Sequence, residues 1–294
     1  MLTVRKYHLN IKDCVNSNLD VTVFGEGKPE VVITGGIHGG ETTGIYAARE
    51  IIKYLEKNNL LNGSVKIISL CNPTAFRRLE RTSPYDNLDL NRIFPGSKQG
   101  TITQRVANAI WNETQTADYI VDLHCCGIHG SSYTLAVWQE HEKAKELAAM
   151  LNIPIIVQSG GARGQLFVET CETGRPAVII ELPGGGQGGV IDQTAGMQAY
   201  QALLNMLRGL KMLSGEYQKP NPIWCNKLIP YRADNEGLFI PHVISGEVVK
   251  EGQVLATLNG KKILAPAKAT VTGIRAMSYV FIGSYLGNLA PHIM

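Results

Sequence analysis

An imidazole and a carboxylate stand three residues apart in the glycine-rich segment 35–41, at His38 and Glu41. The segment follows a β-branched run at 31–34, so it should lie at the strand end where open α/β sheets bind their ligands. A histidine nitrogen and a carboxylate oxygen suit Zn²⁺, which in catalytic sites takes three protein ligands and keeps one position open. The same spacing is also typical of a loop whose glutamate supports a helix N-terminus. A metal site therefore requires a third ligand from elsewhere.

His124 is the candidate for that third ligand. It ends a second short apolar run at 118–123, and two strand ends of one parallel sheet can bring such residues together. Cys125 and Cys126 are alternative ligands, but neighbouring residues of a strand point to opposite faces, so both cannot easily serve. Asp122 can share the face of His124, where it would either orient the imidazole or lie at the surface.

A further carboxylate, Glu181, ends the apolar run within 176–183. Charged side chains seldom occupy such surroundings without a partner or a task. The alternative is a glutamate beyond the strand, solvated beside the glycines at 184–186. Combined with the metal-ligand pattern, Glu181 is a candidate general base. A carboxylate beside a zinc-activated water can take its proton and later deliver it to a leaving amine, since the metal lowers the pKa of water from 15.7 toward ~7.

Several motifs occur in a fixed order along the chain: GGIHGGE, NPTAF, a following arginine, LDLNRIFPG, DLH and IIEL. Together they resemble the succinylglutamate desuccinylase/aspartoacylase family, relatives of the zinc carboxypeptidases. The resemblance covers the chain from about Val31 to near Leu213. It implies one zinc ion per chain, with Glu181 as the catalytic glutamate, and zinc ligands at His38, Glu41 and His124.

The resemblance also implies roles for the polar residues between the first strands. Asn91 and Arg92 would bind a substrate carboxylate, and Arg81 would polarise the scissile carbonyl, with Arg77 and Arg78 as alternatives. The chemistry agrees, because a guanidinium matches a carboxylate bidentately. A second arginine near the metal can stabilise the oxyanion formed during amide hydrolysis, a contribution of ~3 kcal/mol per donor in other enzymes. A solvated basic loop is the alternative explanation of these arginines.

Arg163 lies in the glycine-rich segment 159–164 and is a further candidate for contact with an acidic substrate group. A loop arginine at the surface fits the same pattern. We retain it as a predicted substrate-binding residue.

Composition favours a small anionic substrate. A net charge of +3 with 18% charged residues gives no large basic field, so a nucleic-acid surface is not indicated. Residues 1–6 lack an apolar signal core, and no run approaches the ~20 apolar residues of a membrane span, so we expect a cytoplasmic protein without membrane contact. A homo-oligomer is left open. The cysteines show no disulfide or zinc spacing and should be reduced; they stand at positions 14, 71, 125, 126, 171 and 225.

Strand-like and helix-like runs alternate through the first two thirds of the chain. This pattern predicts an α/β fold with a mostly parallel or mixed sheet and helices on both faces, as in zinc carboxypeptidases. Two strands near 2–9 and 20–24 should lie at an edge. The other expected strands are 31–34, 65–70, 118–123, 155–157 and 177–182, and the expected helices are 42–57, 102–114, 139–151 and 193–213.

The pattern of the sequence changes at the proline-containing linker 214–222, after which it consists of short strand-like runs and turns. We predict a catalytic domain over residues 1–215 and a small all-β domain over 222–294, which resembles the barrel-sandwich hybrid of biotinyl and lipoyl domains. Lys261 and Lys262 follow an Asn-Gly turn but lack the usual carrier context, so they should be ordinary exposed hairpin lysines. The family resemblance implies that this lobe packs beside the cleft and limits substrate size.

These observations predict a zinc-dependent amidohydrolase that cleaves an N-acyl amino acid or a similar small amide with a free carboxylate. A metallocarboxypeptidase acting on short peptides is the first alternative. A non-catalytic module that binds a small carboxylate is the second. Such a module would have no need of Glu181 as a base, which argues against it.

Overall fold

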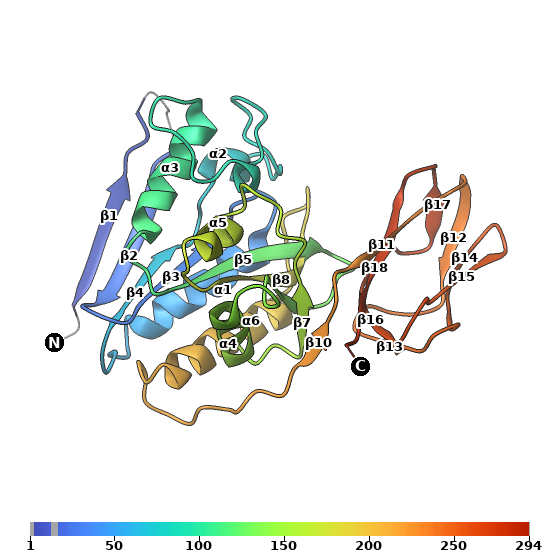
Figure 1. Ribbon diagram of the computed structural model, residues 1–294. Helices are drawn as coiled ribbons and strands as arrows, with labels where there is room; N and C mark the ends of the chain where they lie inside the picture. The colour runs from blue at the N-terminus through green and yellow to red at the C-terminus, as the bar shows by residue number, and fades with distance from the viewer. Residues whose placement is uncertain (1–2, 13–16, 294) are drawn as a thin grey trace.

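The computed structural model describes residues 3–12 and 17–293 of the chain. Ten strands of the described residues form one mixed sheet, in the order β1-β2-β4-β3-β5-β8-β6-β7-β10, with β9 paired to β8. Helices lie on both sides of this sheet, and a lobe of two antiparallel sheets follows at the C-terminus (Figure 1). The predicted fold class is confirmed.

The strands of the large sheet are β1 Val4–Leu9, β2 Leu19–Gly25, β3 Glu30–Gly35, β4 Ser64–Ile68, β5 Tyr119–Gly127, β6 Tyr133–Ala136, β7 Ile155–Gln158, β8 Ala177–Gly185, β9 Val190–Ile191 and β10 Ile223–Cys225. The helices are α1 Thr42–Leu55, α2 Pro73–Phe76, the 3₁₀ helix η1 Leu90–Arg92, α3 Ile102–Thr114, α4 Glu142–Met150, α5 Leu166–Glu172 and α6 Gln193–Gly209. The C-terminal strands are β11 Ile229–Arg232, β12 Gly237–Pro241, β13 Val248–Val249, β14 Val254–Leu258, β15 Lys261–Leu264, β16 Ala269–Ile274, β17 Ser278–Val280 and β18 Tyr285–Pro291.

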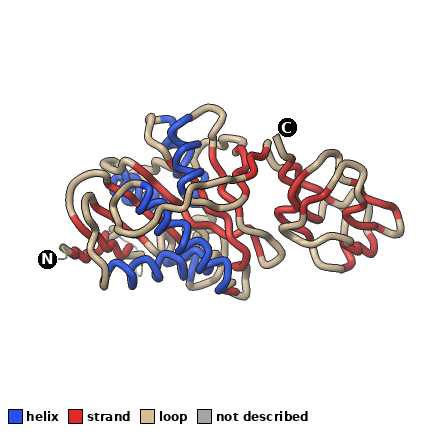
Figure 2. Tube along the Cα trace, turned by 90° about the horizontal axis from the view of Figure 1, so that it is seen from below, coloured by secondary structure: helices blue, strands red, loops and turns tan. Residues whose placement is uncertain are grey.

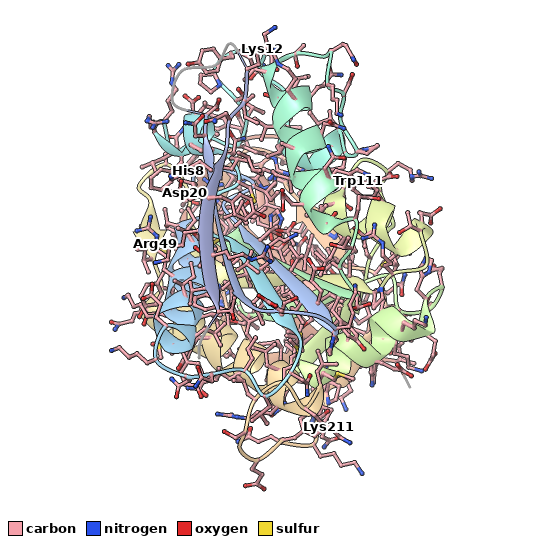
Figure 3. All side chains as sticks on the ribbon, turned by 90° about the vertical axis from the view of Figure 1, so that its left-hand side faces the viewer. His8, Lys12, Asp20, Arg49, Trp111 and Lys211 are labelled. Atoms are coloured by element: carbon pink, nitrogen blue, oxygen red, sulfur yellow. The ribbon has the colours of Figure 1, made fainter. Side chains whose placement is uncertain are left out.

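The centre of the large sheet is parallel. β3 pairs in parallel with β4 and β5, and β5 pairs in parallel with β8. Both faces of these strands are covered, which explains why they read as continuous apolar runs. The antiparallel strands β1 and β2 form one edge, as expected, and there His8 and Asp20 lie side by side with 2.6 Å between Nδ1 and Oδ1 (Figure 3). Residue 2 of the predicted edge strand, and Cys14, lie outside the described residues.

Two apolar layers sandwich the sheet. Alternate residues of a strand face opposite sides. Val121 and Leu123 of β5 pack in the layer that includes α1 and α6, whereas Ile120 packs in the layer that includes α3 and α5. By the same alternation Asp122 and His124 face the side of α3 and α5. Within the described residues, no helix combines the length and apolar character needed to span a membrane.

Most expected elements agree with the structure to within a few residues. The helix expected at 139–151 begins only at Glu142, and the one expected at 193–213 ends at Gly209. Several short elements were not predicted, namely α2, η1 and β9 and, in particular, the three elements β6, α5 and β10. Their lengths of four, seven and three residues are too short to display a strand or helix period.

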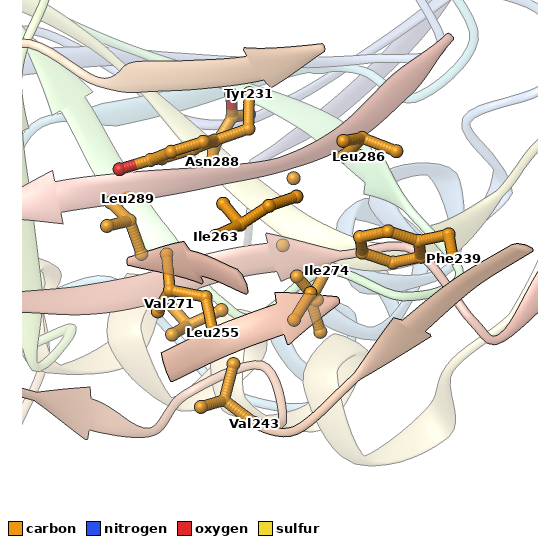
Figure 4. Close-up of a pocket in the computed structure, with 13 residues that line it drawn as sticks. Tyr231, Phe239, Val243, Leu255, Ile263, Val271, Ile274, Leu286, Asn288 and Leu289 are labelled. Atoms are coloured by element: carbon orange, nitrogen blue, oxygen red, sulfur yellow. The ribbon is translucent and has the colours of Figure 1, made fainter. Parts of the chain in front are cut away.

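The C-terminal lobe contains the sheets β11-β18-β16-β13 and β15-β14-β12-β17, and in Figure 2 it stands beside the helix-bearing part as strands and loops only. A space of only about 10 Å³, roughly that of one water molecule, remains between its sheets (Figure 4). The interior of this lobe is therefore filled by side chains. Asn259 and Gly260 adopt positive φ in the β14–β15 turn, and Lys261 lies 3.5 Å from Asp234 as an exposed hairpin lysine.

Two backbone seams join the lobe to the rest of the chain. Gly130, in the segment after β5, forms a bridge with Gly273 of β16, and the N–H of Ser131 donates to the carbonyl of Thr272 at 3.0 Å. At the second seam, β10 adds in parallel to β7 of the large sheet, although it follows residue 222. The division into domains at 215–222 stays a prediction.

Candidate active site

Two neighbouring strand ends bring the predicted ligands together. Gly35, the last residue of β3, pairs with Leu123 of β5 in parallel register. His38 and Glu41, in the loop after β3, therefore reach the edge of the sheet at which His124 stands. Both histidines are almost fully buried, with 3% and 2% exposure. The register of the sheet thus brings His38 and Glu41, which are three residues apart in the sequence, close to His124.

The loop between β3 and α1 follows a path that only glycine permits. A Cβ atom on Gly39 would lie 2.1 Å from the backbone of Ala75 in α2. The N–H of Gly39 donates to the carbonyl of Glu80 at 2.9 Å, and Asn72 caps α2 by accepting from the N–H of Ala75. This close approach of two backbones holds the loop against α2.

Glu41 lies between the two imidazoles. Its Oε1 is 2.8 Å from Nδ1 of His38, and its Oε2 is 2.8 Å from Nδ1 of His124. One ligand atom from each of the three side chains lies within 4.8 Å of the others. Two imidazole nitrogens and a carboxylate oxygen form a donor set known from catalytic zinc sites. The three side chains could therefore hold a metal ion.

The charges of this group are strongly linked. Burial lowers the pKa of both rings, but neighbouring carboxylates outweigh burial and raise it. At His38 these carboxylates are Glu41 and Asp89. At His124 they are Asp122 and Glu41. Burial raises the pKa of Glu41, yet the two rings hold it well below its usual range. A metal ion binds neutral imidazoles and an ionised carboxylate, so it would take the place of ring protons at the centre of the group.

A second carboxylate supports each histidine from behind. Asp89 Oδ1 lies 2.9 Å from Nε2 of His38, and Asp122 Oδ2 lies 2.8 Å from Nε2 of His124. Thr34 donates to the other oxygen of Asp122 at 2.7 Å. Such partners fix the orientation of metal-binding imidazoles. For Asp122 this position was one of the two alternatives that the sequence left open. Asp89 was missed, although its place inside the polar LDLNRIFPG motif was a signal.

Of the three candidate arginines, Arg81 is the one that the structure brings to this group. Its Nε donates to Asp89 Oδ2 at 2.9 Å, and its Nη1 lies 3.9 Å from Glu41 Oε1. Arg77 donates to a backbone carbonyl, and Arg78 faces a neighbouring glutamate at 3.6 Å. The geometry therefore favours Arg81 for any role at the reacting atoms.

The other substrate-binding candidates differ in their placement. Asn91 is buried, its Nδ2 lies 3.4 Å from Nε2 of His124, and its Oδ1 accepts from the first N–H of α5. Arg92 is exposed and donates to the carbonyl of Asn91. The guanidinium of Arg163 is bound by both oxygens of Glu169, at 2.6 and 2.7 Å. Within the described residues, no ion pair links Arg92 or Arg163 to the ligand group, so their roles stay predictions.

Glu181 faces the ligand group from the adjacent strand. It pairs with His124 in the parallel register of β5 and β8, so the two side chains share one face of the sheet. Burial raises the pKa of Glu181 to about 7, with His124 opposing the rise and Glu41 adding to it. A carboxylate with such a pKa exchanges protons near neutral pH, as a general base must.

A cleft of about 590 Å³ gives access to these residues. His38, Glu41 and Arg81 line it together with residues of the glycine-rich loop 184–187. Gly127 also lines it, and the same glycine borders a second hollow of about 470 Å³ between the two lobes. The cleft and the hollow between the lobes therefore share one lining residue at the end of β5.

Comparison with known proteins agrees with this geometry. The profile of the succinylglutamate desuccinylase/aspartoacylase catalytic domain matches residues 27–210. An N-alpha-acetyl-L-2,4-diaminobutyric acid deacetylase from Halomonas elongata is 26% identical over 251 residues, which are 81% of this chain and 73% of that protein. A succinylglutamate desuccinylase from Pseudomonas aeruginosa is 28% identical over 185 residues, which are 53% of this chain and 54% of that protein. The chain thus spans about half the length of this second relative.

A solved structure shares the fold along the whole chain. An aspartoacylase family protein from Mesorhizobium loti superposes with a TM-score of 0.82 at 23% sequence identity, covering 100% of this chain and 98% of the other. The match includes the C-terminal lobe. At 23% identity this likeness shows the fold alone, so the chemistry has to be inferred from the residues of the site.

We expect replacement of either histidine to abolish metal binding, because the two remaining ligands cannot define the site. The measurement is elemental analysis of the wild-type chain and of His38→Ala and His124→Ala after dialysis, with His8→Ala at the far edge of the sheet as the control. The wild type and the control should hold one divalent ion per chain. Undiminished metal in both site variants would contradict the assignment of the ligands.

Proposed function

Because the chain belongs to the succinylglutamate desuccinylase/aspartoacylase family, we propose that it is a zinc-dependent hydrolase that removes the acyl group from a small N-acyl amino acid. The observation that carries the proposal is the convergence of His38, Glu41 and His124 at one point, with Glu181 on the same face of the sheet. Metal-assisted amide hydrolysis uses both parts, a metal with an open position and a base beside it. One zinc ion per chain is the proposed cofactor.

Each residue of the site has a distinct part in this mechanism. When bound, a zinc ion supplies Lewis acidity, which polarises the scissile carbonyl and activates water at neutral pH. Glu181 accepts a proton from the attacking water and then donates it to the nitrogen of the leaving amine. Arg81 stabilises the negative charge that develops on the carbonyl oxygen. Asp89 and Asp122 hold the two imidazoles in their orientations.

The substrate is a small molecule with a free carboxylate. The names of two relatives describe removal of an acetyl group from a diaminobutyric acid and of a succinyl group from a glutamate, so an N-acyl amino acid is the substrate class we assign to this chain. Asn91 and Arg92 would bind the carboxylate of the amino acid, and Arg163 would contact an acidic group after leaving Glu169. The cytoplasmic location stays a prediction.

Two alternatives remain for experiment to separate. A metallocarboxypeptidase would need room for a peptide, and the C-terminal lobe stands near the cleft, since Gly127 lines both the cleft and the hollow between the lobes, which supports a small substrate. A non-catalytic binding module would have no use for Glu181. The test of the proposal is to incubate the purified, zinc-loaded chain with a panel of N-acyl amino acids and to detect the released amine.

Glu181→Gln should retain zinc and fold while kcat falls by ~10²–10⁴, the usual contribution of general acid–base catalysis. Glutamine keeps the size of the side chain but cannot accept the proton. Steady-state kinetics on the identified substrate, together with metal analysis, measures this. Turnover within a few-fold of the wild type would mean that Glu181 is structural and that another group is the base.

The two arginines should separate kinetically. An interaction made only in the transition state lowers kcat when it is lost, whereas one made equally in the ground state raises KM. We therefore expect Arg81→Ala mainly to depress kcat and Arg92→Lys mainly to raise KM. The opposite pattern would show that the oxyanion contact and the carboxylate contact have been exchanged.

The chain should prefer a small N-acyl amino acid over a peptide and should require its free α-carboxylate. A desolvated site built for that group penalises its loss, because the protein partners are left unpaired. The comparison is kcat/KM for an N-acetyl amino acid, its methyl ester and a tetrapeptide ending in the same residue. Better turnover of the tetrapeptide would support the carboxypeptidase alternative, and indifference to esterification would contradict the role of Arg92.

A further inference from the structure

Glu181 differs from the other carboxylates of the site in its contacts. Asp89, Asp122 and Glu41 each contact an imidazole at 2.8 or 2.9 Å. Within the parts of the chain that the structure describes, no hydrogen bond reaches the carboxylate of Glu181. A general base acts only when its oxygen is held in a productive geometry, so some donor has to fix this side chain.

Tyr133 stands directly opposite Glu181 on the neighbouring strand. β6 pairs antiparallel with β8, and Tyr133 is the Cα partner of Glu181 in that register. Directly opposed residues of an antiparallel pair point to the same face, with Cβ atoms about 4.5–5.5 Å apart. Because His124 is the partner of Glu181 on the other side, a row of three side chains crosses the sheet: His124, Glu181 and Tyr133.

The ring of Tyr133 is fixed by packing, whereas its hydroxyl is not engaged. The side chain is 4% exposed and packs with Val157 and Cys225 of the large sheet and with Ala290 of the C-terminal lobe. Among the described residues, no hydrogen bond is formed by its hydroxyl. The hydroxyl oxygen is not one of the fully buried unpaired polar atoms of the described residues, so it keeps contact with solvent and is free to donate to a neighbour. Burial raises the pKa of Tyr133 well above its usual range, and Glu181 is the next cause, so the phenol remains a donor.

Three other donors of the site, Arg81, His124 and Cys126, are already engaged. Arg81 donates to Asp89, and both ring nitrogens of His124 face carboxylates. The thiol of Cys126 donates to a backbone carbonyl at 3.4 Å. A second phenol, Tyr285, also forms no hydrogen bond among the described residues, but it belongs to β18 of the C-terminal lobe and is not paired with β8. Among the described residues, Tyr133 is therefore the unengaged phenol that strand pairing places opposite the base.

We propose, on the premise of the deacylase function above, that Tyr133 is the positioning residue of Glu181: its hydroxyl donates a hydrogen bond to the carboxylate and aims it at the attacking water. The phenol does not touch the reacting atoms in this arrangement and takes no proton. It acts through the base, so its removal should slow the chemical step and leave substrate binding unchanged.

The test compares Tyr133→Phe with the wild type in the full-length, zinc-loaded chain, using the substrate identified by the panel. We expect kcat to fall about 10- to 100-fold, the range for loss of one hydrogen bond to a charged group, with KM within about two-fold. Tm and zinc content should not change, because phenylalanine keeps the packing of the ring. Tyr119→Phe, at the opposite end of β5, is the matched control and should keep wild-type kinetics.

A double-mutant cycle establishes whether Tyr133 acts through Glu181. In the Glu181→Gln background, Tyr133→Phe should cost no more than about two-fold in residual kcat, because the base that it positions is already gone. An equal loss in both backgrounds would overturn the proposal. So would a kcat within two-fold of the wild type for Tyr133→Phe, or a loss of activity accompanied by loss of zinc or a lower Tm.

Further outcomes separate this proposal from the function on which it rests. If Glu181→Gln abolishes turnover while Tyr133→Phe is fully active, the deacylase mechanism stands and the role of Tyr133 is wrong. If Glu181→Gln is fully active on the identified substrate, Glu181 is not the base and the role of Tyr133 is wrong with it, whereas the deacylase function stands. If no N-acyl amino acid of the panel is turned over by the wild type, the function itself is wrong. A loss of kcat in Tyr285→Phe, with Tyr133→Phe unaffected, would transfer the positioning role to the C-terminal lobe and overturn the assignment to Tyr133.

Discussion

The carboxylate of Glu41 is the contact on which the rest of the site depends. Its two oxygens lie 2.8 Å from two different imidazoles, so a single side chain fixes both rings relative to each other. The backbone N–H of Cys125 also donates to this carboxylate at 3.1 Å, which ties the end of β5 to the loop after β3. That loop returns Glu41 to the edge of the sheet within three residues of His38, along the path that Gly39 allows. The fold thus serves mainly to place one carboxylate between two strand ends.

The same cluster explains why a cation belongs there. Glu41, Asp89 and Asp122 are carboxylates, and of the described residues Arg81 is the guanidinium in contact with them. With neutral imidazoles, as metal ligands must be, two negative charges remain before Glu181 is counted. Uncompensated charge in a buried site is costly. A divalent ion at the shared ligand atoms would balance these charges, so Asp89 and Asp122 fit a metal centre better than a purely hydrogen-bonded one.

Features encoded by local runs could be predicted from the sequence, whereas features set by loop paths or long-range pairing could not. The apolar runs at 31–34 and 118–123 predicted both the parallel strands and the meeting of the candidate ligands. The choice of Arg81 over its neighbours depends on the path of the chain after α2, where Leu79 adopts a φ of 53°. β6 and β10 are short, and their place in the sheet is fixed only by partners far away in the sequence. Tyr133 escaped notice for the same reason, because only the pairing of β6 with β8 sets it against Glu181.

The seam between the two lobes limits how freely this protein could be rebuilt. The strand that carries His124 runs on into the segment 127–131, whose backbone bonds to β16, while the ring of Tyr133 packs against Ala290 of β18. The C-terminal lobe is therefore joined to the strand that carries His124 by backbone and side-chain contacts as well as by the chain itself. An exchange of this lobe between relatives would have to preserve the contacts at the seam. A loss of those contacts would shift the ends of β5 and β6, which carry His124 and Tyr133. We expect the two lobes to have diverged together, with substitutions on one side of the seam matched by substitutions on the other.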